Sequence, residues 1–97
     1  MNSILRKLTN EMYQADTNHF YKKVGNYAVA RDYYFYTENY CIRHFYYGKI
    51  ICMVNVNKKE FELHNHNYNN SRLTTAQLNF LEQFYKNKGY KLIYRGE

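Results

Sequence analysis

The sequence has little of what marks a membrane or secreted protein. Among its 97 residues there is no tryptophan or proline, only two cysteines, and no apolar run of membrane length. Since a membrane-spanning helix needs about 20 mostly apolar residues, we expect no membrane association. No secretory leader is present, so we expect an intracellular protein with reduced thiols. Cys41 and Cys52 fall within apolar strand patterns, where we expect small buried hydrophobic side chains.

The sequence also lacks the short motifs of catalysis, metal binding and phosphate binding. It contains no CxxC or HExxH motif, no glycine-rich phosphate loop and no nucleophile elbow. Its 8 acidic residues form no recognisable pair or triad. Catalytic sites form in space, so a missing motif does not exclude an enzyme. A small domain with so few candidate general acids and bases is nevertheless more typical of a binding protein. We therefore expect no enzymatic activity and no cofactor.

What the chain does have is aromatic side chains and positive charge. It contains 13 Tyr and 6 Phe, more rings than a core of this size can bury. Its 14 basic and 8 acidic residues leave a formal charge of +6. An anionic partner would explain this excess, and so would solubility alone.

Two segments have the hydrophobic period of a helix. The first, residues 3–15, has one apolar stripe that consists of Ile4, Leu5, Leu8 and Met12. The second helix is predicted to begin at Thr74, which can form a capping box with Gln77. It is predicted to end at Gly89, because glycine accepts the left-handed conformation that follows a helix end.

Short β-branched and aromatic runs alternate with turn residues between the two helices. The predicted strands are FYKKV, YAVAR, YYFYT, YCIRHFYY, IICMVNV and EFELH, with turns such as Gly25-Asn26 and Gly48-Lys49. A last strand, YKLIYR, would place Tyr90, Leu92 and Tyr94 on one side. We predict one α+β domain over residues 1–97, in the order helix, antiparallel sheet of four to six strands, helix packed on one sheet face, final edge strand.

The stretch LHNHNYNNSRLTT joins the predicted sheet to the second helix. His64 and His66 would project the same way if the strand continued through them. Two imidazoles at that spacing can chelate zinc or copper, but a stable site needs further ligands. Asn and Ser satisfy their own backbone in loops. We therefore predict no metal site, and an exposed loop in which His66 and Tyr68 contact a partner.

The candidate binding residues combine aromatic and basic side chains. The strands YYFYT and YCIRHFYY would display rings near Arg43 on the face away from the helices. Rings stack on unpaired bases and cations neutralise phosphates, while Tyr and Arg also dominate protein interfaces. The predicted partner or nucleic-acid contacts are Tyr34, Tyr36, Arg43, Phe45, Tyr47, His66, Tyr68, Arg72, Lys86, Lys88, Lys91 and Arg95.

The segment YYGKIICMVNV, together with LHNHNYNNSRLTTAQLNFLEQF, resembles short uncharacterised proteins of phages and mobile elements in low-GC bacteria. The matching residues are Tyr47, Gly48, Ile51, Tyr68, Ser71, Thr74 and Thr75. Where that pattern has a histidine after the threonine pair, this chain has Leu78. Small phage proteins of this size include inhibitors of host defence, among them anti-CRISPR proteins, which occlude a nucleic-acid or partner surface. The resemblance therefore implies host-defence evasion in the cytoplasm of a bacterial host cell.

Two functions remain as hypotheses. The first is a non-enzymatic phage or mobile-element accessory protein that binds and inhibits a host protein or ribonucleoprotein complex of defence or nucleic-acid processing. The alternative is a nucleic-acid-binding module whose aromatic and basic sheet face contacts DNA or RNA directly. The salt dependence of binding distinguishes the two hypotheses, because the affinity of phosphate contacts falls steeply as salt rises, whereas that of a packed protein interface changes much less. The sequence leaves the oligomeric state open, a homodimer included.

Overall fold

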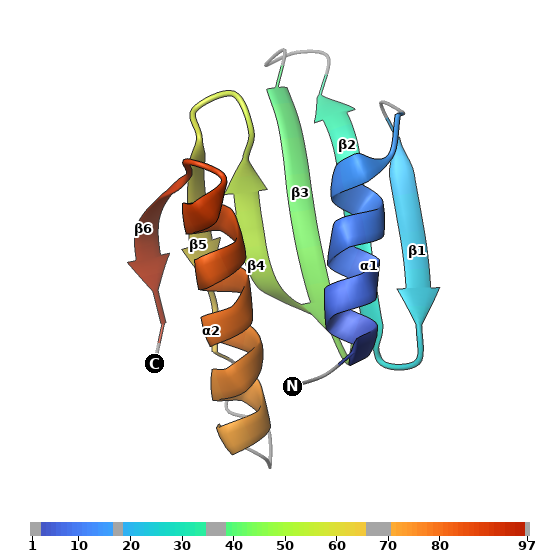
Figure 1. The fold of residues 1–97 in the computed structure, drawn as a ribbon, viewed down its shortest axis with the longest axis vertical. Helices are drawn as coiled ribbons and strands as arrows, with labels where there is room; N and C mark the ends of the chain where they lie inside the picture. The colour runs from blue at the N-terminus through green and yellow to red at the C-terminus, as the bar shows by residue number, and fades with distance from the viewer. Residues whose placement is uncertain (1–2, 17–18, 35–38, 66–70, 97) are drawn as a thin grey trace.

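Six strands form a single sheet, and both helices lie on the same face of it (Figure 1). The computed structural model describes residues 3–16, 19–34, 39–65 and 71–96, without the side chains of Tyr34 and of residues 71–74. The elements are, in chain order, α1 (Ser3–Gln14), β1 (Phe20–Val24), β2 (Tyr27–Tyr34), β3 (Asn39–Tyr46), β4 (Lys49–Asn55), β5 (Glu60–Leu63), α2 (Ser71–Asn87) and β6 (Lys91–Arg95). In this described part of the chain, neither helix is long and apolar enough to cross a membrane.

The order of strands across the sheet follows their order in the chain. Neighbouring strands from β1 to β5 are antiparallel, whereas β5 and β6 are parallel. The parallel pair arises because α2 carries the chain back along the sheet before β6 enters beside β5. The prediction of an α+β domain with a final edge strand is confirmed.

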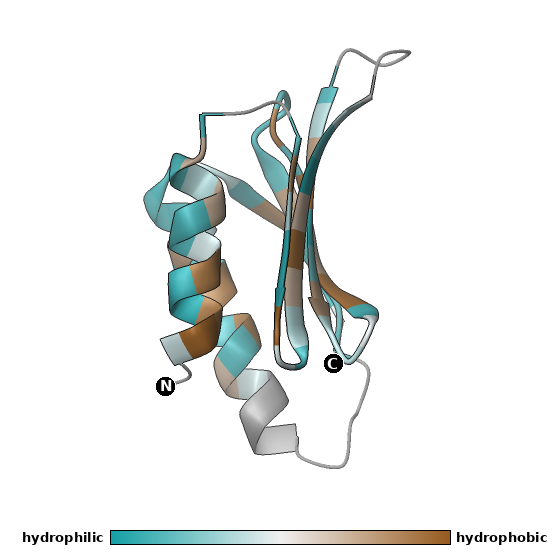
Figure 2. Ribbon diagram, turned by 90° about the vertical axis from the view of Figure 1, so that its right-hand side faces the viewer, coloured by the Kyte–Doolittle hydropathy of each residue, from teal (hydrophilic) through white to brown (hydrophobic). Residues whose placement is uncertain are grey.

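The core lies between the helices and the sheet (Figure 2). α1 packs on β1 and β2, while α2 packs on β4, β5 and β6. The helices contribute Leu5, Leu8, Met12, Leu78, Leu81 and Tyr85, all buried. Each helix has one apolar stripe, and burial against the same sheet face removes both stripes from water.

Two strand boundaries differ from the prediction. The run YAVAR and the residues Tyr33 and Tyr34, with which YYFYT begins, belong to one strand, because no turn residue separates them and Asp32 keeps its place in the ladder opposite Cys41. The turn between β3 and β4 is made by Tyr47 and Gly48, whose φ angles are 52° and 76°, and not by Gly48 and Lys49. Two residues with positive φ suit the tight turn of a twisted hairpin.

A bulge in β4 changes which side chains face the helices. The pairing of β3 with β4 shifts between His44 and Phe45, which lie opposite Cys52 and Ile50 respectively. Ile51 is the extra residue, and both it and Cys52 are 0% exposed. Strict alternation along the strand would place Ile51 on the opposite face.

The capping box predicted for Thr74 and Gln77 is wrong. α2 begins at Ser71, so Thr74 lies within its first turn. Gln77 is buried on the sheet side of the helix, and its Nε2 donates a hydrogen bond to the hydroxyl of Tyr27 at 2.6 Å. The Gln77 side chain also hydrogen-bonds with Tyr46. The glutamine therefore satisfies tyrosine hydroxyls in the core instead of backbone amides at the helix end.

A second polar pair lies at the centre of the core. His44 of β3 and Tyr85 of α2 are buried, and the His44 Nε2 lies 2.6 Å from the Tyr85 Oη. Burial lowers the pKa of His44 to about 3. The imidazole is therefore neutral at pH 7 and shares a hydrogen bond with a neutral phenol. This bond ties α2 to the middle of the sheet.

Removal of the Tyr27 hydroxyl should weaken the fold. We expect Tyr27→Phe to lower the free energy of unfolding by about 1 kcal/mol, because Gln77 loses a buried hydrogen bond. Urea denaturation measures this loss. Tyr27→Phe combined with Gln77→Met should cost less than the sum of the two single changes, because the pair is coupled. Strict additivity would contradict the assigned bond.

Acid should destabilise the protein through His44. Its pKa is near 6.5 when unfolded and about 3 when folded, so the unfolded chain binds more protons between these values. The contribution of neutral His44 to the free energy of unfolding is therefore fully present above the unfolded pKa near 6.5, and it is lost progressively as the pH falls below that value. We expect a loss of about 1.5 kcal/mol between pH 6.5 and 5, measured by urea denaturation. His44→Gln should remove most of this slope, and an unchanged slope in that variant would refute the assignment.

Candidate functional site

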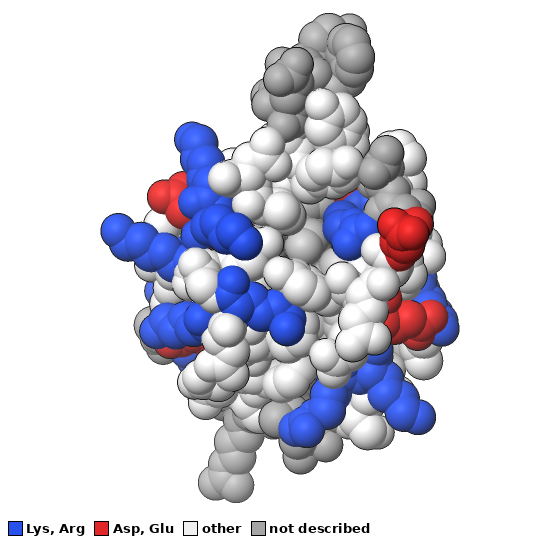
Figure 3. Space-filling model, turned by 45° about the horizontal axis from the view of Figure 1, so that its top comes forward, with Lys and Arg blue, Asp and Glu red and all other residues white. Residues whose placement is uncertain are grey.

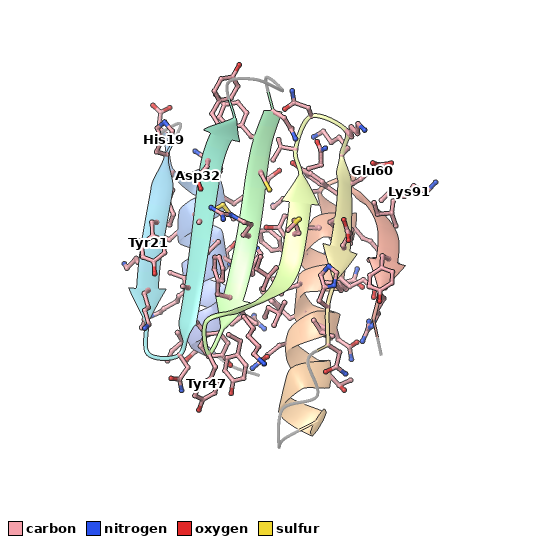
Figure 4. All side chains as sticks on the ribbon, turned by 180° about the vertical axis from the view of Figure 1, so that it is seen from behind. His19, Tyr21, Asp32, Tyr47, Glu60 and Lys91 are labelled. Carbon is pink, nitrogen blue, oxygen red and sulfur yellow. The ribbon has the colours of Figure 1, made fainter. Side chains whose placement is uncertain are left out.

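The second face of the sheet carries no helix of the described chain (Figure 4). We call this surface the open face. Strand alternation and register place on it Tyr21, Lys23, Ala28, Ala30, Asp32, Cys41, Arg43, Phe45, Ile50, Met53, Asn55, Glu60, Glu62, Lys91 and Tyr94. It therefore combines rings, aliphatic side chains and charges on one rigid sheet.

The charges of the open face balance. Its cations are Lys23, Arg43 and Lys91, and its carboxylates are Asp32, Glu60 and Glu62. On the helix-bearing side, by contrast, Lys and Arg outnumber Asp and Glu (Figure 3). The positive charge of the chain therefore lies mainly away from the open face.

An ion pair and a ring occupy the middle of the open face. Arg43 Nη2 lies 2.6 Å from Asp32 Oδ2, and both side chains are about one-third exposed, at 30% and 34%. His19 Nδ1 lies 3.7 Å from the other oxygen of Asp32. The guanidinium of Arg43 also lies 5.8 Å from the centre of the Phe45 ring. Arg43 is thus held in place by a carboxylate and a ring at once.

The other half of the open face has a similar arrangement. His64 Nε2 lies 3.3 Å from Glu62 Oε1, and the His64 and Tyr94 rings are 5.3 Å apart. A bulge between β5 and β6 places Tyr94 opposite Glu62, and Tyr94 is 52% exposed. Leu92 instead packs against the core. The prediction that Leu92 and Tyr94 share one side is therefore wrong, because the bulge interrupts the alternation.

Only some of the predicted contact residues lie together. Arg43 and Phe45 are neighbours at the centre of the open face, and Lys91 lies on the same face at its β6 edge. Tyr47 is 58% exposed in the β3–β4 turn, with its ring 4.6 Å from that of Tyr46. It therefore lies at the end of the sheet and not in the row that holds Arg43 and Phe45.

The other described basic contacts lie toward the helices. Lys86 Nζ and Arg95 Nη1 are 2.7 and 2.6 Å from Glu82, and these hydrogen bonds hold the pKa of Glu82 below its usual range. Lys88 Nζ lies 4.7 Å from the centre of the Tyr13 ring. These three cations do not join the aromatic residues of the open face in one surface.

The remaining predicted contacts fall outside what the structure describes. Tyr36, His66 and Tyr68 lie outside the described residues, and the side chains of Tyr34 and Arg72 are likewise not described. The expectation of a contact loop at His66 and Tyr68 therefore stays a prediction.

Sequence reasoning missed several residues of the open face. Tyr21 is 67% exposed on β1, and Tyr94 and Met53 accompany it on β6 and β4. The turn at Gly25-Asn26 sets the register that places Tyr21 beside Ala30, and the turn at Tyr47-Gly48 sets the register that places Arg43 beside Met53. Register from turn position is thus the signal that identifies Tyr21.

The open face offers weak chemistry for catalysis at its single cysteine. Cys41 is half-buried opposite Asp32, and burial raises the pKa of its thiol, whereas Arg43 lowers that pKa and the Asp32 carboxylate raises it. The reactive thiolate is therefore disfavoured. Across residues 3–16, 19–34, 39–65 and 71–96, no group of three or more His, Cys, Asp or Glu is placed to hold a metal ion.

Comparison with protein families, curated proteins and solved structures found no match for this chain.

The reactivity of Cys41 should report on the ion pair beside it. We expect Asp32→Asn to speed alkylation of Cys41 by iodoacetamide severalfold at pH 8, because Arg43 then favours the thiolate without an opposing carboxylate. Mass spectrometry follows each thiol, and the fully buried Cys52 is the internal control. An unchanged Cys41 rate, or equal acceleration of Cys52, would contradict this electrostatic account.

Proposed function

We propose that this chain is a non-enzymatic binding protein whose open face docks on a protein partner and blocks it. The partner class is a host protein or ribonucleoprotein complex of defence or nucleic-acid processing, and the chain acts as an anti-CRISPR-like inhibitor. The composition of the open face carries the proposal. Phe45 and Met53 lie beside the Arg43–Asp32 pair, Tyr21 and Tyr94 lie on the flanking strands, and the charges of the face cancel.

The open face has the composition of a protein interface. Tyr, Phe, Met and Arg are enriched where proteins meet, and binding energy concentrates on such residues near the centre. Phe45 and Arg43 occupy the centre here, and Tyr21 and Tyr94 occupy the flanks. Because β-strands hold these side chains, little conformational entropy is lost when a partner binds.

Charge favours a protein partner over nucleic acid at this face. Phosphate binding requires a surplus of cations, since each phosphate contact neutralises a charge and releases counterions. The open face instead has as many carboxylates as cations, and Glu60 and Glu62 would repel a phosphate backbone. The resemblance to small phage proteins adds the class of partner, because such proteins act by covering a surface.

Two phenylalanines provide a matched test of the docking face. Phe45 on the open face and Phe80 on α2 are both half-buried, and each has an arginine 5.8 Å from its ring centre. We expect Phe45→Ser to lose at least about tenfold in partner affinity, as for a residue at the centre of an interface. Phe80→Ser should bind like the parent chain, because it lies on the helix-bearing side.

The experiment is affinity capture from bacterial lysate, followed by reconstitution with the purified partner. We expect one protein or complex that the parent chain and Phe80→Ser retain, that Phe45→Ser loses, and that resists both nuclease and 0.5 M salt. Its activity should fall as the parent chain is added. Release by nuclease or salt would favour the nucleic-acid alternative, and a partner whose activity is unchanged would refute inhibition.

A further inference from the structure

A cavity of about 510 Å³ opens between the C-terminal ends of the two helices, above β3. Its walls come from segments distant in sequence: the end of α1, strands β2 and β3, the β4–β5 turn and the residue before β6. Its volume is within the range of small-molecule sites. It lies on the helix-bearing side, on the opposite side of the sheet from the open face.

Three tyrosines line this cavity. They are Tyr13, Tyr40 and Tyr90, one from each of three separate segments. Burial and a hydrogen bond with Tyr13 raise the pKa of Tyr90, so its hydroxyl stays protonated. The cavity therefore offers aromatic surface together with hydroxyl groups that can donate and accept hydrogen bonds.

Cations surround these rings. Arg31 lines the cavity, and its Nη1 and Nη2 donate to the carbonyl oxygens of Met12 and Ala15 at 3.4 and 2.9 Å. These bonds fix the guanidinium at the end of α1, where a cation also suits the helix dipole. Figure 3 brings this end of the molecule forward and shows basic side chains around it.

Two lysines stand beside the same walls. Lys88 Nζ is 4.7 Å from the Tyr13 ring centre, and Lys59 Nζ is 4.8 Å from that of Tyr90. Both lysines are exposed, where a cation–π contact is weak. Either ammonium group can therefore turn from the ring to an anion at small cost. Asp16 is the one carboxylate among the described lining residues.

We propose that this cavity binds a ribonucleoside monophosphate unit, either as a free nucleotide or as the end of an RNA strand. The base lies against the tyrosine rings, which offer the aromatic surface on which every base can stack. The phosphate lies toward Arg31, Lys59 and Lys88, which supply charge-assisted hydrogen bonds. Asp16 accepts a hydrogen bond from a sugar hydroxyl, as carboxylates do in ribose sites.

Other ligand classes fit the cavity less well. A divalent cation would meet Arg31 and two lysines with one opposing carboxylate, Asp16. A purely apolar ligand would displace water from the tyrosine hydroxyls and Arg31 without replacing the hydrogen bonds that this water makes. An anion that carries a flat ring uses both the rings and the cations.

Isothermal titration calorimetry with defined probes tests the proposal. The probes are AMP, adenosine, inorganic phosphate, and a six-residue RNA with and without a 5′-phosphate. We expect AMP or the phosphorylated RNA to bind at least about tenfold more tightly than adenosine or phosphate alone. Tighter binding of AMP identifies a free nucleotide, and tighter binding of the phosphorylated RNA identifies a strand end.

Charge-reversal variants locate the site. Lys59→Glu with Lys88→Glu should weaken binding of the better probe by about tenfold or more, because two attractive charges become repulsive. Lys7→Glu, an exposed position on α1 away from the cavity, is the matched control and should bind normally. Ala15→Trp should fill the cavity and abolish binding, with circular dichroism confirming that it folds.

Three results would overturn the nucleotide site. They are no binding of any probe at millimolar concentration, equal binding of adenosine or phosphate and AMP, and equal weakening by Lys7→Glu. Phe45→Ser should leave nucleotide binding unchanged, because Phe45 lies on the open face. The nucleotide site and the protein-docking face are therefore tested independently of each other.

Discussion

Both helices lie on one face of the six-stranded sheet, and this arrangement governs the rest of the molecule. Each helix has a single apolar stripe, so each must lie against the sheet with that stripe inward. Because both lie on the same face, that face becomes the core and the other meets water. The strands therefore divide their residues between the helix-bearing side and the open face, and the buried residues of the sheet lie mainly in β2 to β5.

The thin core explains the polar pairs within it. Tyr27, Tyr46 and Tyr85 fill volume that aliphatic side chains alone do not supply, and their hydroxyls enter the interior with the rings. A buried hydroxyl without a partner costs free energy. Gln77 and His44 reach these hydroxyls from the facing layer, so α2 and the sheet are joined by directional bonds as well as by packing.

The sequence predicts the architecture well because hydrophobic period and turn residues are local signals. The helix over residues 3–15, the Gly25-Asn26 hairpin and the final strand all follow from a few neighbouring residues. The errors arise where tertiary contacts override the local pattern. Gln77 has the spacing of a capping box but faces the sheet, and the bulge at Ile51 shifts alternation in a way that only cross-strand pairing reveals.

The candidate surfaces were harder to predict for the same reason. Composition shows that the chain has surplus rings and cations, but not that folding separates them. Cross-strand register gathers Arg43, Phe45 and Asp32 into a neutral patch, whereas Arg31, on the neighbouring register position of β2, turns to the helix side. One residue along a strand changes the face, so a single basic, aromatic chain acquires two surfaces of different electrostatic character. A neutral face suits a packed protein interface and a basic hollow suits an anion, and the sheet between them allows both to be occupied at once.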